Sequence, residues 1–402
     1  MDVSKVREDF PTIQNAHGIY LDSACQSLRP RAVMDSIMEY YSEYPACGGR
    51  GAHWMTAQVD RRIDETRESL SRFFNGECCN SFVFTKNCTE GINLIASGLE
   101  LGSDDVVLTS AFEHNSNHVP WLRASKEHGV KRRTVKGTVD GSFDMDDFKR
   151  KMDRNVRLVS IGHVSNVTGQ EAPLKEIVEV AHDYGALVLA DGSQAAPHIK
   201  VDFDRLDVDF YSASIHKMLG PTGMGFLYGK MEHLRKLRPL AVGGGSVGDT
   251  NMDSASYAEC PERFEYGLQN YSGIVGTKAA IDYLEGVGME NVKKHDNSLM
   301  RTLFDEIRDF EGIRIFGSTD PGKRCGIFTF SLDGMPSYDV GTMMDEMSRI
   351  MVRTGMLCSH PTFKAWNSNG AVRASTYIYN NEDEIRTFIC TLKRIRDIFA
   401  TH

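Results

Sequence analysis

Short runs of apolar and β-branched residues alternate with segments of helical periodicity between about residues 81 and 230. The apolar positions of LKEIVEVAHDYG (174–185) recur at the spacing of one helix face. Near-continuous apolar strands alternating with helices are typical of a mainly parallel sheet covered on both faces. The pattern therefore predicts an α/β fold with strands at SFVFT (81–85), DVVLTS (105–110), VRLVSIGHVSN (156–166), ALVLADGS (186–193), DFYSAS (209–214) and GMGFLYGK (223–230).

The pattern changes after about residue 277 and predicts a smaller α+β domain. The expected helices are 276–288, 289–310 and 382–399, and the expected strands are 325–332, 350–355 and 371–379. The glycine-rich, polar segment 241–254 is predicted to be a loop. We expect a large domain over 21–275, a small C-terminal domain over 276–402, and an N-terminal segment, 1–20, that packs with the small domain.

Charge and composition exclude several classes of protein. The net charge of −9 argues against a general nucleic-acid binder. No apolar run approaches the ~20 residues that span a bilayer, and the charged N-terminus lacks a signal-peptide core, so we expect no membrane insertion and a cytoplasmic protein. The nine cysteines contain no CxxC pair, so most are expected to be free thiols and a metal site has little support.

Polar residues follow several of the predicted strands. Asp191 ends one strand, Asn166 and His114 follow two others, and Ser214, His216 and Lys217 follow a fourth. Each alone is a common turn or cap residue. Because ligands of open α/β sheets bind outside the carboxyl ends of the strands, we expect these side chains to converge on one crevice.

The segment TKNCTEGINL (85–94) places a helix start near Thr89, directly after a predicted strand. Exposed N–H groups and the Thr89 hydroxyl make an anion site there, although an ordinary helix cap explains the segment in isolation. A phosphate site, a carboxylate, a histidine and a lysine together suit pyridoxal phosphate (PLP). That cofactor needs an anion cradle, an acid beside its pyridine nitrogen and a lysine to carry it as a Schiff base.

The chain resembles the class V family of fold-type I PLP enzymes, and within it the cysteine desulfurases of the SUF type. The likeness covers nearly the whole chain and is most specific where Asp191-x-x-Gln194 is followed by His216-Lys217. It implies a seven-stranded, mainly parallel sheet, a homodimer, L-cysteine or L-selenocysteine as substrate, and a sulfur-acceptor protein. The motifs that carry it are YLDSACQS, CTEGINL, EHNSNHVPW, HVSNVTG, ADGSQAAPH, DFYSASIHKMLGPTGMGFLYG, RFEYG, SYDV, VRTGMLC and VRASTYIYN.

The resemblance implies a role for each matching residue. Lys217 is similar to the Schiff-base lysine, which removes the substrate Cα proton, and His114 to the histidine that stacks on the ring. Asp191 matches the partner of the pyridinium nitrogen and Gln194 the donor to the ring's phenolic oxygen. The remaining positions match phosphate contacts (Cys88, Thr89, Ser214, His216) and substrate contacts (Asn166, Arg373, Arg353, Arg50).

Cys358 decides the reaction, because its position matches the cysteine that forms a persulfide in the desulfurases. It follows a predicted strand on an expected exposed loop, where nearby Arg353 would favour its thiolate. The resemblance therefore implies conversion of L-cysteine to L-alanine. Selenocysteine lyase, another C–S lyase, a class V aminotransferase and a non-catalytic binding protein of the same fold are the alternatives.

The chain departs from the family pattern at several places. Met356 and Leu357 replace two histidines before the cysteine, and His360 follows it. Cys88 replaces a threonine of the phosphate turn, and Gly49 replaces a histidine. The stretch 267–270 reads Gly-Leu-Gln-Asn where the family carries a threonine that reaches the neighbouring subunit's phosphate.

Overall fold

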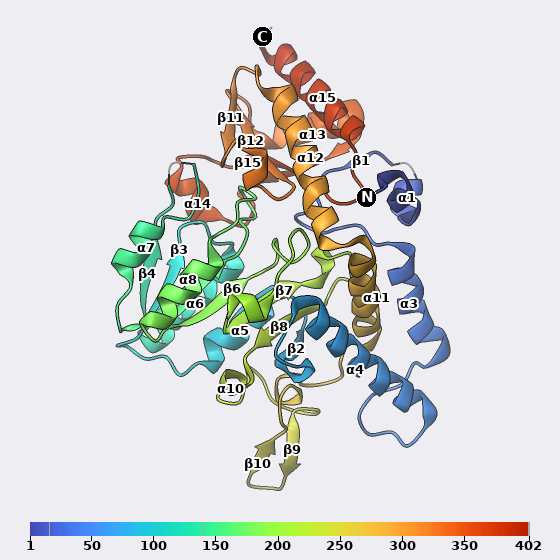
Figure 1. Ribbon diagram of the computed structural model, residues 1–402, viewed down its shortest axis with the longest axis vertical. Helices are drawn as coiled ribbons and strands as arrows, with labels where there is room; N and C mark the ends of the chain where they lie inside the picture. The colour runs from blue at the N-terminus through green and yellow to red at the C-terminus, as the bar shows by residue number, and fades with distance from the viewer. Residues whose placement is uncertain (16, 139, 401–402) are drawn as a thin grey trace.

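A seven-stranded sheet forms the centre of the larger part of the protein (Figure 1). This computed structural model describes residues 1–15, 17–138 and 140–400. The strand order is β2-β8-β7-β6-β5-β3-β4; β8 pairs antiparallel with β2 and with β7, and the other neighbours pair in parallel. The strands are β2 (Phe82–Thr85), β3 (Val106–Ser110), β4 (Lys131–Val135), β5 (Val156–Gly162), β6 (Leu187–Asp191), β7 (Phe210–Ser214) and β8 (Gly225–Gly229).

Helices cover both faces of this sheet, which explains why most of its strands are apolar throughout. On β2, Phe82 and Phe84 pack into one core cluster, whereas Val83 between them packs into another. The first cluster includes residues of α4 (Trp54–Phe74), α8 (Leu174–Asp183) and α11 (Tyr271–Val287); the second includes residues of α5 (Cys88–Gly98) and α6 (Val119–His128). The predicted α/β fold with a mainly parallel sheet is therefore confirmed.

A four-stranded antiparallel sheet of order β11-β12-β15-β14 forms the C-terminal part. Its core contains Phe328, Phe330 and Leu392 and takes in Leu21 from the N-terminal region, next to β1 (Ile19–Tyr20). β1 pairs in parallel with β13 (Ile350–Met351). The other elements are β11 (Ile313–Phe316), β12 (Ile327–Leu332), β14 (Arg353–Gly355), β15 (Ala371–Ser375), α12 (Met289–Ile307), α13 (Ser337–Ser348) and α15 (Glu382–Ala400). The division into domains at 21 and 276 stays a prediction.

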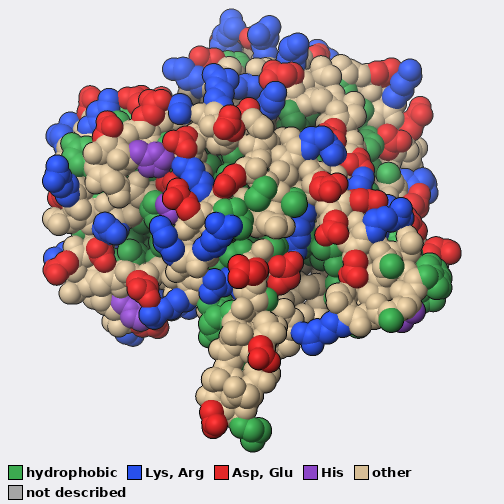
Figure 2. Space-filling view, turned by 60° about the horizontal axis from the view of Figure 1, so that its bottom comes forward, with side chains coloured by type: hydrophobic (Ala, Val, Ile, Leu, Met, Phe, Trp, Pro, Cys, Tyr) green, Lys and Arg blue, Asp and Glu red, His purple; other side chains and the backbone are tan. Residues whose placement is uncertain are grey.

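Three expectations about local structure were wrong. Segment 241–254 is not simply a loop: β9 (Val247–Thr250) and β10 (Ala255–Tyr257) form a hairpin that projects from the surface (Figures 1 and 2). Asn251 Oδ1 accepts hydrogen bonds from the backbone of Asp253 and Ser254, and this local turn chemistry closes the hairpin. Residues 350–355 form two strands, β13 and β14, in different sheets, and only 371–375 of segment 371–379 is a strand.

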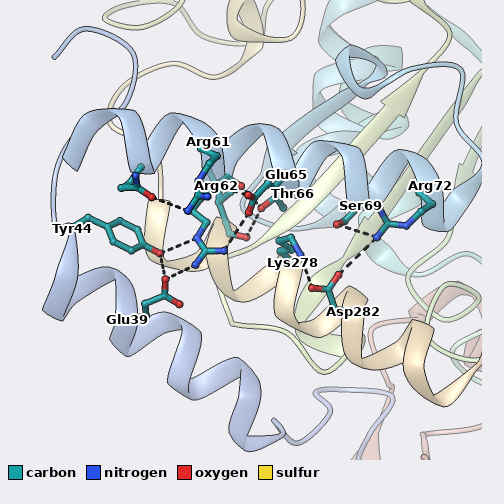
Figure 3. Close-up of polar contacts among 12 residues, drawn as sticks. Glu39, Tyr44, Arg61, Arg62, Glu65, Thr66, Ser69, Arg72, Lys278 and Asp282 are labelled. Carbon is teal, nitrogen blue, oxygen red and sulfur yellow. Dashed lines mark hydrogen bonds and ion pairs between the residues drawn. The ribbon is translucent and has the colours of Figure 1, made fainter. Parts of the chain in front are cut away.

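Helix α11 packs with both α3 (Arg31–Glu43) and α4 beside the large sheet. Figure 3 shows polar side chains that bridge the three helices. Arg62 of α4 pairs with Glu39 of α3 and donates to the Tyr44 hydroxyl at 3.2 Å. A buried pair, Arg67 with Glu265 at 2.6 Å, ties α4 to the segment that precedes α11. These contacts hold the helices beside the β2 edge of the sheet.

Within the described residues no helix is long and apolar enough to cross a membrane. The short α-helices are α1 (Val3–Glu8), α2 (Pro11–Gln14), α7 (Met145–Lys151), α9 (Phe203–Leu206), α10 (Met231–Leu234) and α14 (His360–Ala365).

Candidate active site

A cavity of about 370 Å³ lies at the carboxyl ends of β3, β5, β6 and β7, facing β14 and β15 of the smaller sheet. All but one of the residues predicted for the site line this cavity. Arg50 is the exception: it is exposed in the segment between α3 and α4 and does not line the cavity. The predicted residues on the wall are Cys88, Thr89, His114, Asn166, Asp191, Gln194, Ser214, His216, Lys217, Arg353, Cys358 and Arg373.

Lys217 follows β7 on a single 3₁₀ turn, Ile215–Lys217, that begins where the strand ends. It lines the cavity, and within the described residues its ammonium makes no hydrogen bond or ion pair. Burial lowers its pKa, and the nearby Arg373 lowers it further, while Asp191 acts in the opposite direction. A lysine in this setting gives up its proton more readily than one in water.

Asp191 ends β6 with its carboxylate directed at the same space. Its Oδ1 accepts hydrogen bonds from the Ser193 backbone at 3.0 Å and from the Cys88 thiol at 3.3 Å. Cys88 is buried, and burial together with Asp191 raises the pKa of its thiol well above the usual value. Cys88 is therefore a neutral hydrogen-bond donor to the carboxylate.

The N-terminus of α5 forms a second wall of the cavity. Asn87 caps the helix by accepting a hydrogen bond from the Glu90 backbone at 3.0 Å, and the Cys88 N–H donates to Ser214 Oγ at 2.9 Å. The Thr89 and Ser116 hydroxyls lie 2.7 Å apart beside this helix start. Two hydroxyls at the positive end of an eleven-residue helix can hold a phosphate.

Both cavity histidines have lowered pKa values. Burial, followed by the charge of Lys217, lowers the pKa of His114 and of His216 to about 4. The Ser116 N–H donates to His114 Nδ1 at 3.1 Å, so the imidazole carries its proton on Nε2. Each ring is neutral at neutral pH, and His114 presents an uncharged aromatic surface to the cavity.

Arg373 of β15 brings a permanent positive charge into the cavity. Its Nη1 donates to the Asn166 carbonyl at 3.0 Å, and its Nη2 lies 3.6 Å from Asp22. Its buried Nε has no partner among the residues that the structure describes. Gln194 is also incompletely satisfied: Nε2 donates to the Ala24 carbonyl at 2.7 Å, while no described residue donates to Oε1. Unpaired buried polar atoms in a cavity indicate groups that await a ligand.

Arg353 has partners other than the expected one. Its Nη2 donates to Asp22 Oδ2 at 2.6 Å and to Cys25 Sγ at 3.0 Å. The expectation that Arg353 supports the Cys358 thiolate stays a prediction, because the contacts of its guanidinium are with Asp22 and Cys25.

Cys358 is exposed on the turn between β14 and α14, as expected from the sequence. Leu357 and Cys358 both adopt left-handed backbone conformations, with φ of 47° and 53°, which non-glycine residues seldom adopt. Asn166 Nδ2 donates to the Leu357 carbonyl at 2.8 Å and the Asn115 N–H to the Cys358 carbonyl at 2.7 Å. Leu357 is itself buried against Val167 and Phe363, so the turn is held from both sides.

Sequence reasoning missed several residues of this wall, among them Ser116, Glu113 and Cys25. Glu113 accepts hydrogen bonds from Ser110, Asn117 and Gly162, yet burial raises its pKa to about 7. A carboxylate directly before His114 was a usable signal for Glu113. Cys25 lies on the cavity wall because nearby Asp22 forms a β-bridge with Ser375 of the distant strand β15. No local sequence pattern shows this long-range pairing.

Comparisons with known proteins indicate the same protein family along nearly the whole chain. The sequence model of the family described as Aminotransferase class-V matches residues 19–388. A probable cysteine desulfurase of Halalkalibacterium halodurans is 34% identical over 100% of this chain and 99% of its own length. A probable cysteine desulfurase of Methanothermobacter thermautotrophicus is 37% identical over 98% of both chains.

Solved structures give the same result. The apo cysteine desulfurase from Thermococcus onnurineus superposes with a TM-score of 0.94 at 33% identity, covering 98% of this chain and 97% of that one. The cysteine desulfurase CsdA from Escherichia coli gives a TM-score of 0.92 at 29% identity, covering 99% of both. A C-DES variant with glycine covalently linked to its PLP cofactor shares the fold, with a TM-score of 0.84 at 24% identity over 96% of this chain and 98% of its own.

Proposed function

The chain belongs to the class-V aminotransferase family, and from that premise we propose that it is a PLP-dependent cysteine desulfurase. It converts L-cysteine to L-alanine and keeps the sulfur as a persulfide on Cys358. One observation carries this proposal: Lys217, which pairs with no other described residue, and the exposed Cys358 lie on the wall of the same cavity. An aminotransferase needs the lysine but has no use for the cysteine.

The residues present fit PLP. Lys217 has no competing partner within the described residues, Asp191 presents a carboxylate, and the α5 N-terminus offers a phosphate cradle. The Gln194 amide has a second N–H beyond the one that Ala24 occupies, as a donor to a ring oxygen requires. Bound there through Lys217, the cofactor would supply an electron sink for chemistry at the substrate Cα.

Lys217 would move the proton at the substrate Cα. A base must be neutral before it can accept a proton, and the buried surroundings of Lys217 lower its pKa toward that condition. His114 is neutral for the same reason, so it adds no charge beside the ring.

Cys358 would take the sulfur. Its thiolate attacks the substrate sulfur, a new S–S bond forms, and the C–S bond breaks with its electron pair left on the carbon, which is then protonated to give alanine. The turn at Leu357 and Cys358 is anchored through backbone carbonyls, so the side chain of Cys358 stays free for this attack.

Arg373 would bind the substrate carboxylate, since its buried guanidinium has an unpaired Nε and a planar fork suits a carboxylate. Asn166 orients Arg373 through its carbonyl and holds the Cys358 turn through its amide. Arg353 would contribute from the rim of the same cavity. Arg50 lies outside the cavity, so a substrate contact by it would come from the second subunit of a homodimer.

We also place the enzyme in the cytoplasm, with a separate protein as sulfur acceptor. Supporting the location, all nine cysteines are free thiols, which is typical of a reducing compartment. The exposed Cys358 turn supports delivery of sulfur to a partner rather than its retention in a closed site.

The decisive experiment supplies the PLP-loaded protein with L-cysteine and measures alanine, sulfide and protein persulfide together. Alanine and persulfide should form in equal amounts in the first turnover. Amino-group transfer that requires a keto acid and leaves no persulfide would overturn the proposal in favour of an aminotransferase. Activity with L-selenocysteine and none with L-cysteine would instead identify a selenocysteine lyase.

A further inference from the structure

Cys25 is a further thiol on the wall of the cavity that contains Lys217, Cys358 and the buried Cys88. It is half-buried, and it lies in the turn that follows β1, far from Cys358 in sequence. The proposed desulfurase reaction does not require this thiol.

The turn that carries Cys25 is fixed on both sides. On one side the Ala24 N–H donates to Ser375 Oγ of β15 at 2.9 Å. On the other side the Ser27 N–H donates to the carbonyl of His216, next to Lys217, at 3.0 Å. Cys25 therefore sits between the strand that carries Arg373 and the turn that carries Lys217, and its position is set by both.

The surroundings of Cys25 suit a sulfur anion. Arg353 donates a charge-assisted hydrogen bond to Cys25 Sγ at 3.0 Å, and Asp22 fixes that guanidinium with a 2.6 Å contact. Burial lowers the pKa of Lys217 and of Arg373, and the charge of Cys25 raises both in part. Both cations therefore lie close enough to interact electrostatically with a Cys25 thiolate. Cys358, by contrast, has no hydrogen bond to its sulfur within the described residues.

We propose that Cys25 is a second sulfur-carrying residue that takes the sulfane sulfur from Cys358. The inference rests on the proposed desulfurase activity. The Cys25 thiolate attacks the outer sulfur of the Cys358 persulfide, a bond forms between that sulfur and Cys25 Sγ, and the S–S bond to Cys358 breaks. The electron pair leaves with Cys358 Sγ, and the persulfide proton travels with the transferred sulfur. No oxidant or reductant is needed, because a thiolate replaces a thiolate.

This transfer would move the sulfur from an exposed turn to a half-buried site beside Arg353. A persulfide on Cys25 would be stored near cations that stabilise its anion, while Cys358 becomes free for another substrate. The enzyme would then hold two sulfur atoms for each chain.

The test maps sulfur by peptide. The PLP-loaded protein reacts with L-cysteine without reductant, is quenched by alkylation, and is digested with trypsin. The sequence separates the thiols, because Cys25 is the only cysteine of peptide 8–31 and Cys358 the only one of peptide 354–364. The parent should gain one extra sulfur on 354–364 first and on 8–31 later.

Variants fix the direction of transfer. Cys25→Ser and Cys25→Ala should carry extra sulfur on 354–364 alone, which also shows that they fold and react. Cys358→Ser should carry none on 8–31. Exposed Cys390 on α15, in peptide 387–393, should gain none in the parent, and Cys390→Ser should behave as the parent does.

Several outcomes would overturn the inference. A parent with extra sulfur on Cys358 and none on Cys25 refutes the relay while leaving the desulfurase proposal intact. Equal labelling of Cys25 and Cys390 means indiscriminate exchange and also refutes it. Sulfur on Cys25 in the Cys358→Ser variant means direct capture from substrate, against the proposed order. If no alanine forms and no peptide gains sulfur, the desulfurase proposal fails as well.

Discussion

The thiol of Cys88 lies 3.3 Å from Oδ1 of Asp191, at the point where the first turn of α5 meets the end of β6. Cys88 and the Ser193 N–H both donate to that oxygen, so the hydrogen bonds that the described residues make to this carboxylate come from neutral donors. The charge of Asp191 is therefore left for a ligand in the cavity.

Removing that charge should abolish most turnover. Asp191→Ala is expected to retain some PLP but to lose at least ~100-fold in the rate of alanine formation, since an unprotonated pyridine is a poor electron sink. Asp191→Asn is the matched variant, because it keeps the shape and the hydrogen-bond geometry without the charge. Turnover near that of the parent in the asparagine variant would contradict the assigned role.

Thiol labelling should separate the cysteines by their environment. The pKa values of buried Cys88 and Cys325 are raised by burial, so both should resist N-ethylmaleimide in the native protein. Exposed Cys47, Cys358 and Cys390 should react readily. Peptide mass mapping before and after unfolding measures this difference, and rapid native labelling of Cys88 would be inconsistent with the described site.

Lys217→Ala should lose the covalent attachment of PLP. Borohydride treatment of the parent should leave the cofactor permanently bound to one tryptic peptide, and the variant should show no such adduct. Lys86→Ala is the control, because Lys86 is exposed beside the same helix N-terminus and should leave the adduct unchanged. An adduct that persists without Lys217 would assign the covalent link to another lysine.

Cys358→Ser should separate a desulfurase from its relatives. The variant is expected to bind PLP and L-cysteine but to make alanine at least ~100-fold more slowly, because a serine hydroxyl is a far weaker nucleophile toward sulfur. Selenium release from L-selenocysteine should fall less, since selenium is the better leaving group. Alanine formation from L-cysteine at the parent rate would refute the persulfide mechanism.

Glu113 should make stability fall as the pH rises. Its folded-state pKa is raised to about 7 from 4.5, so between these values the folded protein holds a proton that the unfolded chain has lost. The stability due to this group is complete below pH 4.5 and is lost as the pH rises through 7. His114 and His216 act in the opposite direction, because their lowered pKa values cost stability as the pH falls below 6.5.

Glu113→Gln isolates the carboxyl contribution. The stability of the variant relative to the parent should increase by about 3 kcal/mol between pH 4 and pH 8. Urea unfolding of both proteins across this pH range measures the difference in their free energies of unfolding. The contributions of His114 and His216 are common to both proteins and drop out of this difference. A difference that does not change with pH would mean that folding leaves the pKa of Glu113 unshifted.

Most of the fold and much of the site were predictable because the strands are buried on both faces. Such strands read as continuous apolar runs, and their carboxyl ends necessarily place Asp191, Asn166 and Lys217 together. The β9–β10 hairpin was missed because its residues are mostly exposed, so no burial pattern marks them.

The partners of Arg353 could not be predicted for a different reason. Asp22 and Cys25 reach it only through pairing between the N-terminal segment and the last strands of the smaller sheet, more than 300 residues away in the chain. Sequence proximity suggested Cys358 instead, but a side chain on a twisted strand need not point toward the turn that follows it.

The burial of Leu357 has a consequence for how often Cys358 can leave the cavity. The buried side chain stabilises the docked turn by about 2 kcal/mol, the usual contribution of a leucine removed from water. Consider a conformer in which the turn leaves the cavity, loses this packing and makes no new contacts. About 3% of the molecules would adopt it at equilibrium. An acceptor that binds only this conformer would show an apparent affinity about thirtyfold weaker than its intrinsic one. Delivery of sulfur would then be limited by how often the leucine leaves its site, and a smaller residue at position 357 would speed delivery without touching the thiol.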